Sequence, residues 1–243
     1  MRFVLGLLML LPLMTPAATN DDDVARYLAI FRGDKTLHAS AAESLGWMGL
    51  SDARLFDLIE ERVLADYPAP REVKAARQRL AWYIRALGFS GQEKYLPTIN
   101  KFLHERDYAT YARHALKDLS DYKKWNPIIS DRSSFDAKLS DDANRAINMI
   151  RASDFRLKEI GAKRVYYGRV REAPVFEALA SEVLASYAGA NGNNNDEIAW
   201  MVKALASSGD GKYRPVVQEV AEKTTDAKIA RHARTSLDSY GKR

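Results

Sequence analysis

The side chains best suited to acid–base or metal chemistry at neutral pH are histidines, because the chain contains no cysteine. The four histidines are His38, His104, His114 and His232. None of them lies in an HExxH zinc motif, and no serine lies in a GxSxG nucleophile motif. The absence of cysteine also removes disulfides, thiolate metal sites and thiol nucleophiles. We therefore expect no catalytic residues, no cofactor and no bound metal.

One loop carries oxygen-bearing side chains in the manner of a calcium site. It runs Asn191-Gly-Asn-Asn-Asn-Asp196, but it lacks the DxDxDG spacing and a following bidentate acid. We expect instead that Asn194 or Asn195 caps the next helix, with the glycine supplying the tight turn. The acids of Glu60-Glu61 fit a helix surface, and those of Asp141-Asp142 fit a helix start.

An internal duplication organises the chain. Residues 81–122 align with residues 199–240 without a gap, and 16 of the 42 positions are identical. Trp82 aligns with Trp200 and His114 with His232. Long self-similarity of this kind indicates a repeat architecture. We place the duplicated halves at about 22–122 and 142–240, joined by a linker at 123–140 in which Asn126-Pro127 breaks the helical pattern.

The first 18 residues have the composition of a signal peptide. A positive start at Arg2 precedes an apolar run of 12 residues and a short segment of small residues, Thr15 to Thr19. The run is shorter than the ~20 residues that span a bilayer, so we expect cleavage rather than a transmembrane helix. Without cysteine the chain cannot carry a lipoprotein anchor. The sequence thus predicts a periplasmic or secreted protein, with the domain proper at 19–243.

Hydrophobic periodicity predicts helices almost throughout. Apolar residues recur at three and four positions, as in Leu55, Leu58, Ile59 and Val63, and no segment shows sustained strand alternation. Turn residues divide the helices into six helical hairpins. These hairpins are expected at about 22–49, 52–89, 93–122, 142–170, 173–208 and 212–240.

The second helix of each pair carries small residues followed by an apolar anchor, as in Ala41-Ala42-Glu-Ser-Leu45-Gly46. The anchors are Leu45, Leu87, Leu119, Val165, Leu205 and Leu237, spaced by 32 to 46 residues. This pattern resembles HEAT repeats, including the HEAT-like variety common in bacteria, over essentially the whole mature chain. In that family a unit often has a Pro in its first helix, an Asp in the turn and, in the second helix, an Arg that pairs with the Asp. Pro97, Asp107 and Arg113 match this set, so the resemblance implies an ion pair between Asp107 and Arg113. In the last unit Pro215 and Arg231 fit, but Asp226 is one position late, and the other four units lack the set.

The resemblance implies an all-α fold, an α-solenoid wound as a right-handed superhelix of about six HEAT-like helical hairpins. A tetratricopeptide array is the nearest competitor, but its repeats are a regular 34 residues long. In HEAT solenoids the second helices line the concave face. A projection of 100° per residue then gives the residues that point away from each anchor. The candidate groove residues are Trp47, Trp82, Arg85, Phe89, His114, Lys117, Arg156, Lys163, Tyr167, Trp200, Lys203 and His232.

Aromatic rings ringed by cations suit an interface hot spot, so one interpretation is a binding groove. Its partner would be another protein, an extended acidic peptide or an anionic envelope polymer. The other interpretation is that Trp82 and Trp200 pack against the next helix and that the cations form a solvated face. The formal net charge of +5 is too small to argue for nucleic acid.

We expect a non-enzymatic protein-binding or scaffold module of the bacterial cell envelope. An alternative from another class is an envelope enzyme, such as a cell-wall hydrolase, with carboxylates between repeats. Two carboxyl groups ~5–10 Å apart in the groove would favour that enzyme, and an acid-free groove would favour binding. HEAT-type enzymes that hold metal use several His-Glu pairs, whereas this chain has only His104-Glu105. A third alternative is a purely structural subunit.

Overall fold

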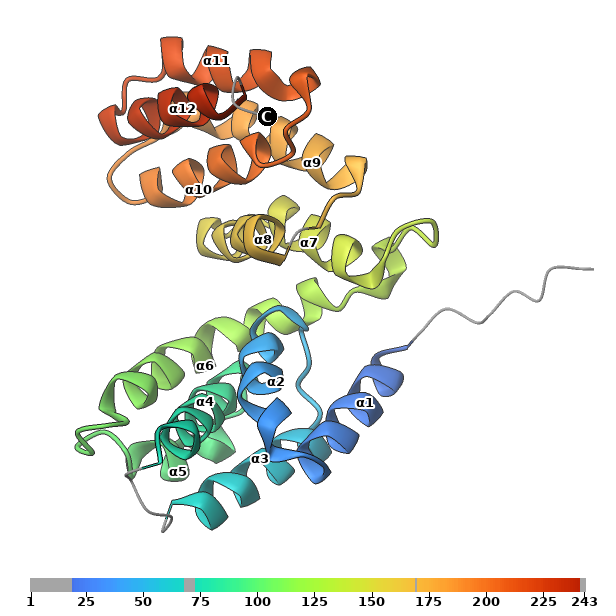
Figure 1. The fold of residues 1–243 in the computed structure, drawn as a ribbon, viewed down its shortest axis with the longest axis vertical. Coiled ribbons are helices and arrows are strands. Elements are labelled where there is room, and N and C mark those ends of the chain that lie inside the picture. Colours follow the sequence, from blue (N-terminus) through green and yellow to red (C-terminus); the bar gives the residue numbers. More distant parts are fainter. Residues whose placement is uncertain (1–18, 68–72, 169, 241–243) are drawn as a thin grey trace, which may run out of the picture.

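The structure is a computed structural model that describes residues 19–67, 73–168 and 170–240. The predicted signal peptide at 1–18 lies outside the described residues. Within the described ranges the chain is entirely helical, without a strand, and holds twelve α-helices. The predicted all-α class is therefore confirmed, and the helices are arranged as an α-solenoid (Figure 1).

The α-helices follow one another as six hairpins. They are α1 (Asn20–Arg32) with α2 (His38–Ser44), α3 (Ala53–Asp66) with α4 (Lys74–Phe89), α5 (Leu96–Asn100) with α6 (Ala109–Ile129), α7 (Asp141–Arg151) with α8 (Phe155–Gly168), α9 (Ala173–Ser186) with α10 (Asn195–Ala206), and α11 (Arg214–Lys223) with α12 (Ala227–Tyr240). Short 3-10 turns join or precede several of them: η1 (Lys35–Leu37), η2 (Leu45–Trp47), η3 (Glu93–Tyr95), η4 (Arg132–Ser134), η5 (Tyr187–Gly189) and η6 (Gly211–Tyr213).

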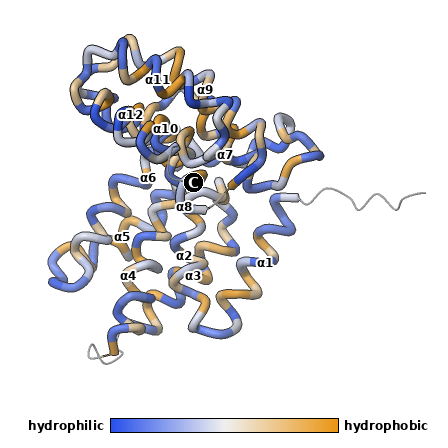
Figure 2. The backbone as a smooth tube through the Cα atoms, turned by 45° about the horizontal axis from the view of Figure 1, so that its top comes forward, coloured by the Kyte–Doolittle hydropathy of each residue, from blue (hydrophilic) through white to orange (hydrophobic). Residues whose placement is uncertain are grey.

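The hairpins form two stacks, which we call the N-terminal stack (α1–α6) and the C-terminal stack (α7–α12). Figure 1 shows the N-terminal stack below and the C-terminal stack above. Within each stack the second helices are neighbours, because α4 packs on α2 and α6, and α10 packs on α8 and α12. Hydrophobic and hydrophilic residues alternate along the helices of both stacks (Figure 2), as expected for helices that each bury one face.

Small residues in the second helices allow neighbouring helices to approach them closely. A Cβ atom added to Gly88 in α4 would lie 2.5 Å from the carbonyl oxygen of Ala115 in α6. A Cβ atom on Gly161 in α8 would lie 2.8 Å from the Cβ of Met149 in α7. Because these distances are far below van der Waals contact, any larger residue would push the paired helices apart.

The core consists of two hydrophobic clusters that meet at the junction of the stacks. The first cluster runs from Val24 to Ile129 and also includes Met149, Ala152 and Leu157 from α7, α8 and the turn between them. The second cluster lies within the C-terminal stack. The first cluster therefore crosses the boundary between the duplicated halves.

The first part of the expected linker, residues 123–129, belongs to α6, which corrects the predicted break at Asn126-Pro127. Helix α6 continues to Ile129 with Pro127 inside it. Proline costs only one backbone hydrogen bond in this last turn. The side-chain amide of Asn126, which is buried, donates to the carbonyl oxygens of Phe89 at 2.9 Å and Ser90 at 3.3 Å. These bonds anchor the end of α6 to the end of α4.

Two smaller expectations also need correction. Asn194 is the N-cap residue of α10, but its side chain makes no capping bond; its Oδ1 accepts the backbone N–H of Asn191 at 2.8 Å instead. The resemblance to HEAT repeats implies an ion pair between Asp107 and Arg113. The structure describes both side chains and shows no such pair, and Arg113 donates to Thr110 Oγ1 at 3.3 Å.

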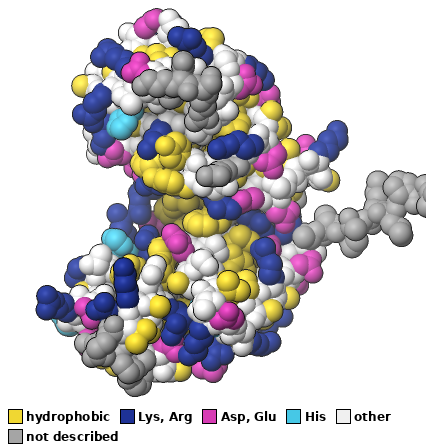
Figure 3. All heavy atoms as spheres, in the orientation of Figure 1, with side chains coloured by type: hydrophobic (Ala, Val, Ile, Leu, Met, Phe, Trp, Pro, Cys, Tyr) yellow, Lys and Arg dark blue, Asp and Glu magenta, His cyan; other side chains and the backbone are white. Residues whose placement is uncertain are grey.

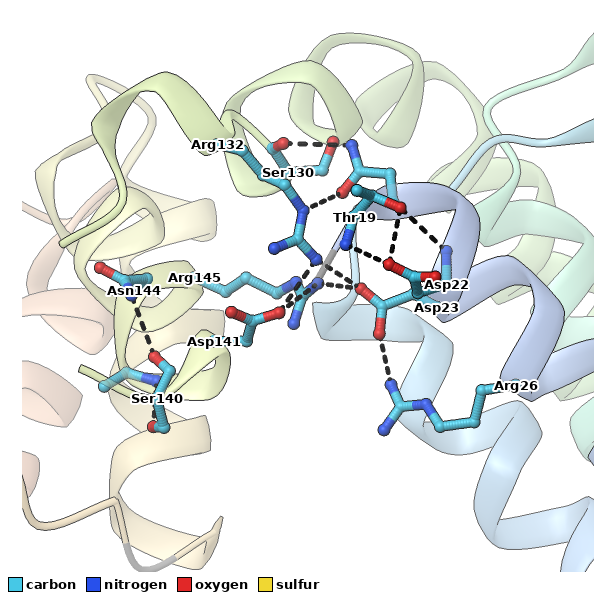
Figure 4. Close-up of polar contacts among 12 residues, drawn as sticks. Thr19, Asp22, Asp23, Arg26, Ser130, Arg132, Ser140, Asp141, Asn144 and Arg145 are labelled. Carbon is cyan, nitrogen blue, oxygen red and sulfur yellow. Dashed lines mark hydrogen bonds and ion pairs between the residues drawn. The ribbon is translucent and has the colours of Figure 1, made fainter. Parts of the chain in front are cut away.

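An ion cluster joins the first helix to the fourth hairpin (Figure 4). The buried carboxylate of Asp23 in α1 accepts hydrogen bonds from Arg26 at 2.7 Å, from Arg132 at 2.9 Å and from Arg145 in α7. Arg132 also donates to Asp141 at 2.9 Å, in the first turn of α7. Asp23 lies in the N-terminal stack, and Arg145, 122 positions later in the sequence, lies in the C-terminal stack. The cluster therefore holds one stack against the other.

Candidate functional site

A cavity of about 550 Å³ lies between the two stacks. Figure 3 shows the molecule hollowed at this level. The second helices α2, α4, α6 and α8, with η2, supply its walls. We call it the central groove, lined by Glu43, Gly46, Trp47, Trp82, Arg85, Phe89, Asp118, Tyr122, Arg156, Glu159, Ile160, Lys163, Arg164, Tyr167 and Gly168.

Seven of the twelve candidate groove residues line the central groove. They are Trp47, Trp82, Arg85, Phe89, Arg156, Lys163 and Tyr167. Trp200 continues this surface on α10, where its ring lies 5.8 Å from that of Tyr167, and Lys203 lies beside it. His114 and Lys117 on α6 and His232 on α12 are not among the lining residues; the first two are exposed and His232 is half-buried.

The tryptophans both pack against neighbouring helices and line the surface. Trp82 meets Tyr111 of α6 edge to face, with ring centroids 5.9 Å apart. Trp200 lies against Tyr166 at 6.1 Å as well as Tyr167. Both indoles are half-buried. The two interpretations left open by the sequence therefore do not exclude each other.

Cations lie over several aromatic rings of the groove. The guanidinium of Arg85 lies 5.6 Å from the ring centroid of Trp82 and 5.5 Å from that of Phe89. The guanidinium of Arg164 in α8 lies 4.6 Å from the ring of Trp47 in η2. The contact between Arg164 and Trp47 joins the two stacks. Trp47 and Arg164 also line a neighbouring cavity of about 590 Å³, so this pair separates the two cavities.

The central groove also contains three carboxylates, so it is not acid-free. Glu43 is exposed, Asp118 is buried and Glu159 is half-buried. Asp118 Oδ2 lies 3.3 Å from Arg85 Nε, and Glu159 lies 2.7 Å from Lys163 Nζ. Burial raises the pKa of the Asp118 carboxyl above its usual value, because the loss of water outweighs the attraction of Arg85.

The remaining groove cations are paired with carboxylates on neighbouring segments. Arg156 Nη1 lies 2.5 Å from Asp121 Oδ2 at the end of the N-terminal stack. Arg164 forms a two-bond pair with Asp142, with 2.9 Å between Nε and Oδ1. Because each of these cations already has a counter-charge, the groove is much closer to neutral than its sequence suggests.

Lys203, which lies beside Trp200, differs in this respect, because no ion pair of the described residues includes it. Lys203 Nζ lies 4.5 Å from the ring centroids of both Tyr166 and Trp200. Lys163 Nζ lies 4.9 Å from the same indole. The pKa of His232 is lowered by burial first, and then by the charges of Arg231, Lys203 and Lys228. The unpaired ammonium of Lys203 therefore makes this end of the surface more positive than the central groove.

The sequence projection missed several groove residues, notably Asp118, Glu159 and Arg164. A projection about a single helix axis shows which residues oppose the core of one stack. It does not show that α8 faces α2 and η2 across the junction. For Arg164 the only available signal was the basic composition of its helix, which also fits a solvated surface.

The other histidines lie away from the groove. His38 is buried, and its Nδ1 shares a hydrogen bond with the hydroxyl of Tyr83. Burial lowers the pKa of His38. His104 is exposed. Within the described ranges no three His, Asp or Glu side chains gather as a metal site, and no described helix is long and apolar enough to cross a membrane.

No family model and no curated protein matches the sequence. Among solved structures, the chain is similar to the structure of human deoxyhypusine hydroxylase in complex with glycerol. The match covers 91% of this chain and 85% of that chain, with 13% sequence identity and a TM-score of 0.38.

Proposed function

We propose that the chain is a HEAT-like binding or scaffold module of the bacterial cell envelope, and that its central groove holds an extended acidic segment of a partner protein. The supporting observation is the row of aromatic rings, each covered by a cation, that runs from Trp47 and Trp82 to Trp200. Rings of this kind supply most of the energy at interface hot spots. The signal-peptide composition of residues 1–18 supports the envelope location.

The mixed lining suits a peptide better than an isolated ion. A guanidinium has five N–H donors, so Arg85, which lies over Trp82 and donates through Nε to Asp118, keeps further N–H groups for hydrogen bonds to a peptide. Glu43 can accept hydrogen bonds from peptide N–H groups, and the rings offer apolar area to side chains. A volume of about 550 Å³ is typical of a pocket for a few residues or a small ligand.

The test combines capture and titration. The chain from residue 19 onward captures partners from envelope extract, and the captured protein is then purified and titrated against variants. The double variant Tyr167→Ala with Lys163→Glu removes an exposed ring and reverses a charge at the groove, so it should weaken binding at least tenfold. Tyr167 has 67% of its surface exposed, so its removal should leave the fold intact. Leu184→Ala, on α9 with 40% exposure, serves as the matched control and should bind as wild type. Equal binding by all three proteins would place the site elsewhere.

A second candidate function is an envelope enzyme such as a cell-wall hydrolase, and Asp118 is the observation that favours it. Its carboxyl is buried in a cavity with two other carboxylates, and its pKa is raised. Paired carboxyl groups in unequal surroundings are a common acid–base arrangement. Turnover of cell-wall polymer by the wild type, and its loss in Asp118→Asn, would replace the binding proposal.

A further inference from the structure

The internal duplication places the same aromatic–cation unit in both stacks. At the offset of 118 positions, Trp82 corresponds to Trp200 and Arg85 to Lys203. In each case the cation covers the ring three positions before it on the same helix, at 5.6 Å in α4 and 4.5 Å in α10. The two units are therefore equivalent in geometry as well as in sequence.

The two units differ in their counter-charge. In the N-terminal stack Arg85 is paired with the buried carboxylate of Asp118, on the neighbouring helix α6. The residue that corresponds to Asp118 in the C-terminal stack, 118 positions later, is Ser236 on α12. Serine carries no charge, and no carboxylate of the described residues forms an ion pair with Lys203. The duplication thus keeps the unit and removes its neutralisation in one half.

The surroundings of Lys203 add positive charge. Lys163 reaches the same indole from α8, although it also pairs with Glu159. Lys228 pairs with Asp196, whereas no ion pair of the described residues includes Lys203. Burial lowers the pKa of His232, and the charges of Arg231, Lys203 and Lys228 lower it further. An anion bound here would be attracted by Lys203 and would break few existing ion pairs.

We propose that Lys203 and Trp200 form the anchor point for a carboxylate side chain of the bound acidic segment. The carboxylate would pair with Lys203 Nζ, and the rest of the segment would lie against Trp200 and the exposed ring of Tyr167 toward the central groove. This inference rests on the proposed function and assigns its charge recognition to the C-terminal stack. The equivalent unit at Trp82 contributes contact area rather than charge.

The test uses an N-acetylated decaglutamate peptide, titrated calorimetrically into the chain from residue 19 onward at low salt. Lys203→Gln should weaken binding about tenfold, equivalent to ~1.4 kcal/mol. Ser236→Asp should weaken it similarly, because it restores the carboxylate that neutralises the other unit. Lys223→Gln is the matched control, since it removes the same charge from α11, where the lysine pairs with Glu219 at 3.3 Å, and it should bind as wild type. Circular dichroism checks that each variant is folded.

If Lys203→Gln binds decaglutamate within twofold of the wild type, the inference is overturned. The result for Lys203→Gln is sufficient even if Ser236→Asp does not fold. Absence of decaglutamate binding by the wild type would also overturn it. Capture of a partner that depends on Tyr167 and Lys163 would still stand in either case, so the two failures are distinguishable. Tighter binding of a polyphosphate of similar length, again lost in Lys203→Gln, would replace the peptide by an anionic polymer.

Discussion

At the scale of single residues, the groove is built from side chains that serve packing and surface chemistry together. Trp82 contacts Tyr111 on one side and supports Arg85 on the other. Seven of the twelve candidates line the central groove, because helical phase decides which side chains oppose the core. The sequence could not predict that Asp118 neutralises Arg85, since that depends on which rotamers meet across two helices.

Histidine burial gives a prediction at this scale. The pKa of His38 is lowered by burial, so below about pH 6.5 the unfolded chain binds a proton that the folded chain does not. The free energy of unfolding should therefore fall as pH drops from 6.5 toward 5, by at most ~1.4 kcal/mol per pH unit for this group. Above pH 6.5 the contribution is constant.

Urea unfolding of the wild type and of His38→Asn at pH 7.5, 6.5 and 5.5 measures this effect. The variant should show the shallower decline on acidification, although it is less stable at pH 7.5 because the bond to Tyr83 is altered. His104→Asn, at an exposed position, is the control and should retain the wild-type slope. Parallel curves for His38→Asn and the wild type would show that His38 titrates as it does in the unfolded chain.

At the scale of elements, the hairpins follow from periodicity and turn chemistry alone. The expected 52–89 and 173–208 segments closely match α3 with α4 and α9 with α10, because glycine, proline and acidic turn residues mark their ends. The end of α6 was not predictable in the same way. Its proline is a helix breaker by local rules, whereas the buried Asn126 amide ties it to α4, far away in sequence.

The ion cluster around Asp23 yields the prediction at this scale. Replacing Asp23 by alanine leaves the guanidinium of Arg145, which is 3% exposed, buried without its main partner. Removing one member of a buried pair typically costs 3–5 kcal/mol. Asp141 recovers little of this, because its carboxylate lies 3.8 Å from Arg145 and is already bound by Arg132 at 2.9 Å. We expect Asp23→Ala to lower the free energy of unfolding by about 3 kcal/mol.

Chemical unfolding checks this loss against two further proteins. Asp21→Ala removes an acid two positions away whose side chain is 85% exposed and pairs with Arg54, and it should change stability by less than ~1 kcal/mol. The double variant Asp23→Leu with Arg145→Met replaces the pair by apolar groups and should recover most of the loss. If Asp23→Ala behaves like Asp21→Ala, the cluster does not hold α1 to α7.

At the scale of the whole molecule, the central groove is a product of how the two stacks meet. Seven of its fifteen lining residues were candidates from the sequence. The others, including Arg164 and Glu159, come into place only because α8 faces η2 across the junction. Contacts across the junction join residues that are far apart in the sequence, so no local sequence pattern specifies them. The same contacts determine whether the duplicated halves unfold together.

The junction is apolar enough to couple the halves. Leu157 belongs to α8 in the C-terminal stack, yet it is fully buried in the core cluster of the N-terminal stack. Trp125, at the end of α6, donates its indole N–H to Asp154 at the start of α8 with 3.0 Å between the heavy atoms. Unfolding either stack alone would expose this shared surface, so we expect one cooperative transition for the whole chain.

Two single-tryptophan proteins report the stacks separately, one retaining Trp125 and the other Trp200. The tryptophan replacements change the stability of each protein. After correction for this change, the urea midpoints reported by Trp125 and by Trp200 should coincide. Adding Leu157→Ala to each should cost 2–5 kcal/mol, the usual cost of emptying a buried leucine site, and should lower both midpoints by the same amount, because the shared surface belongs to both stacks. A shift seen by Trp125 alone would mean that the C-terminal stack folds independently, in which case the groove between the stacks could change its width without unfolding either one.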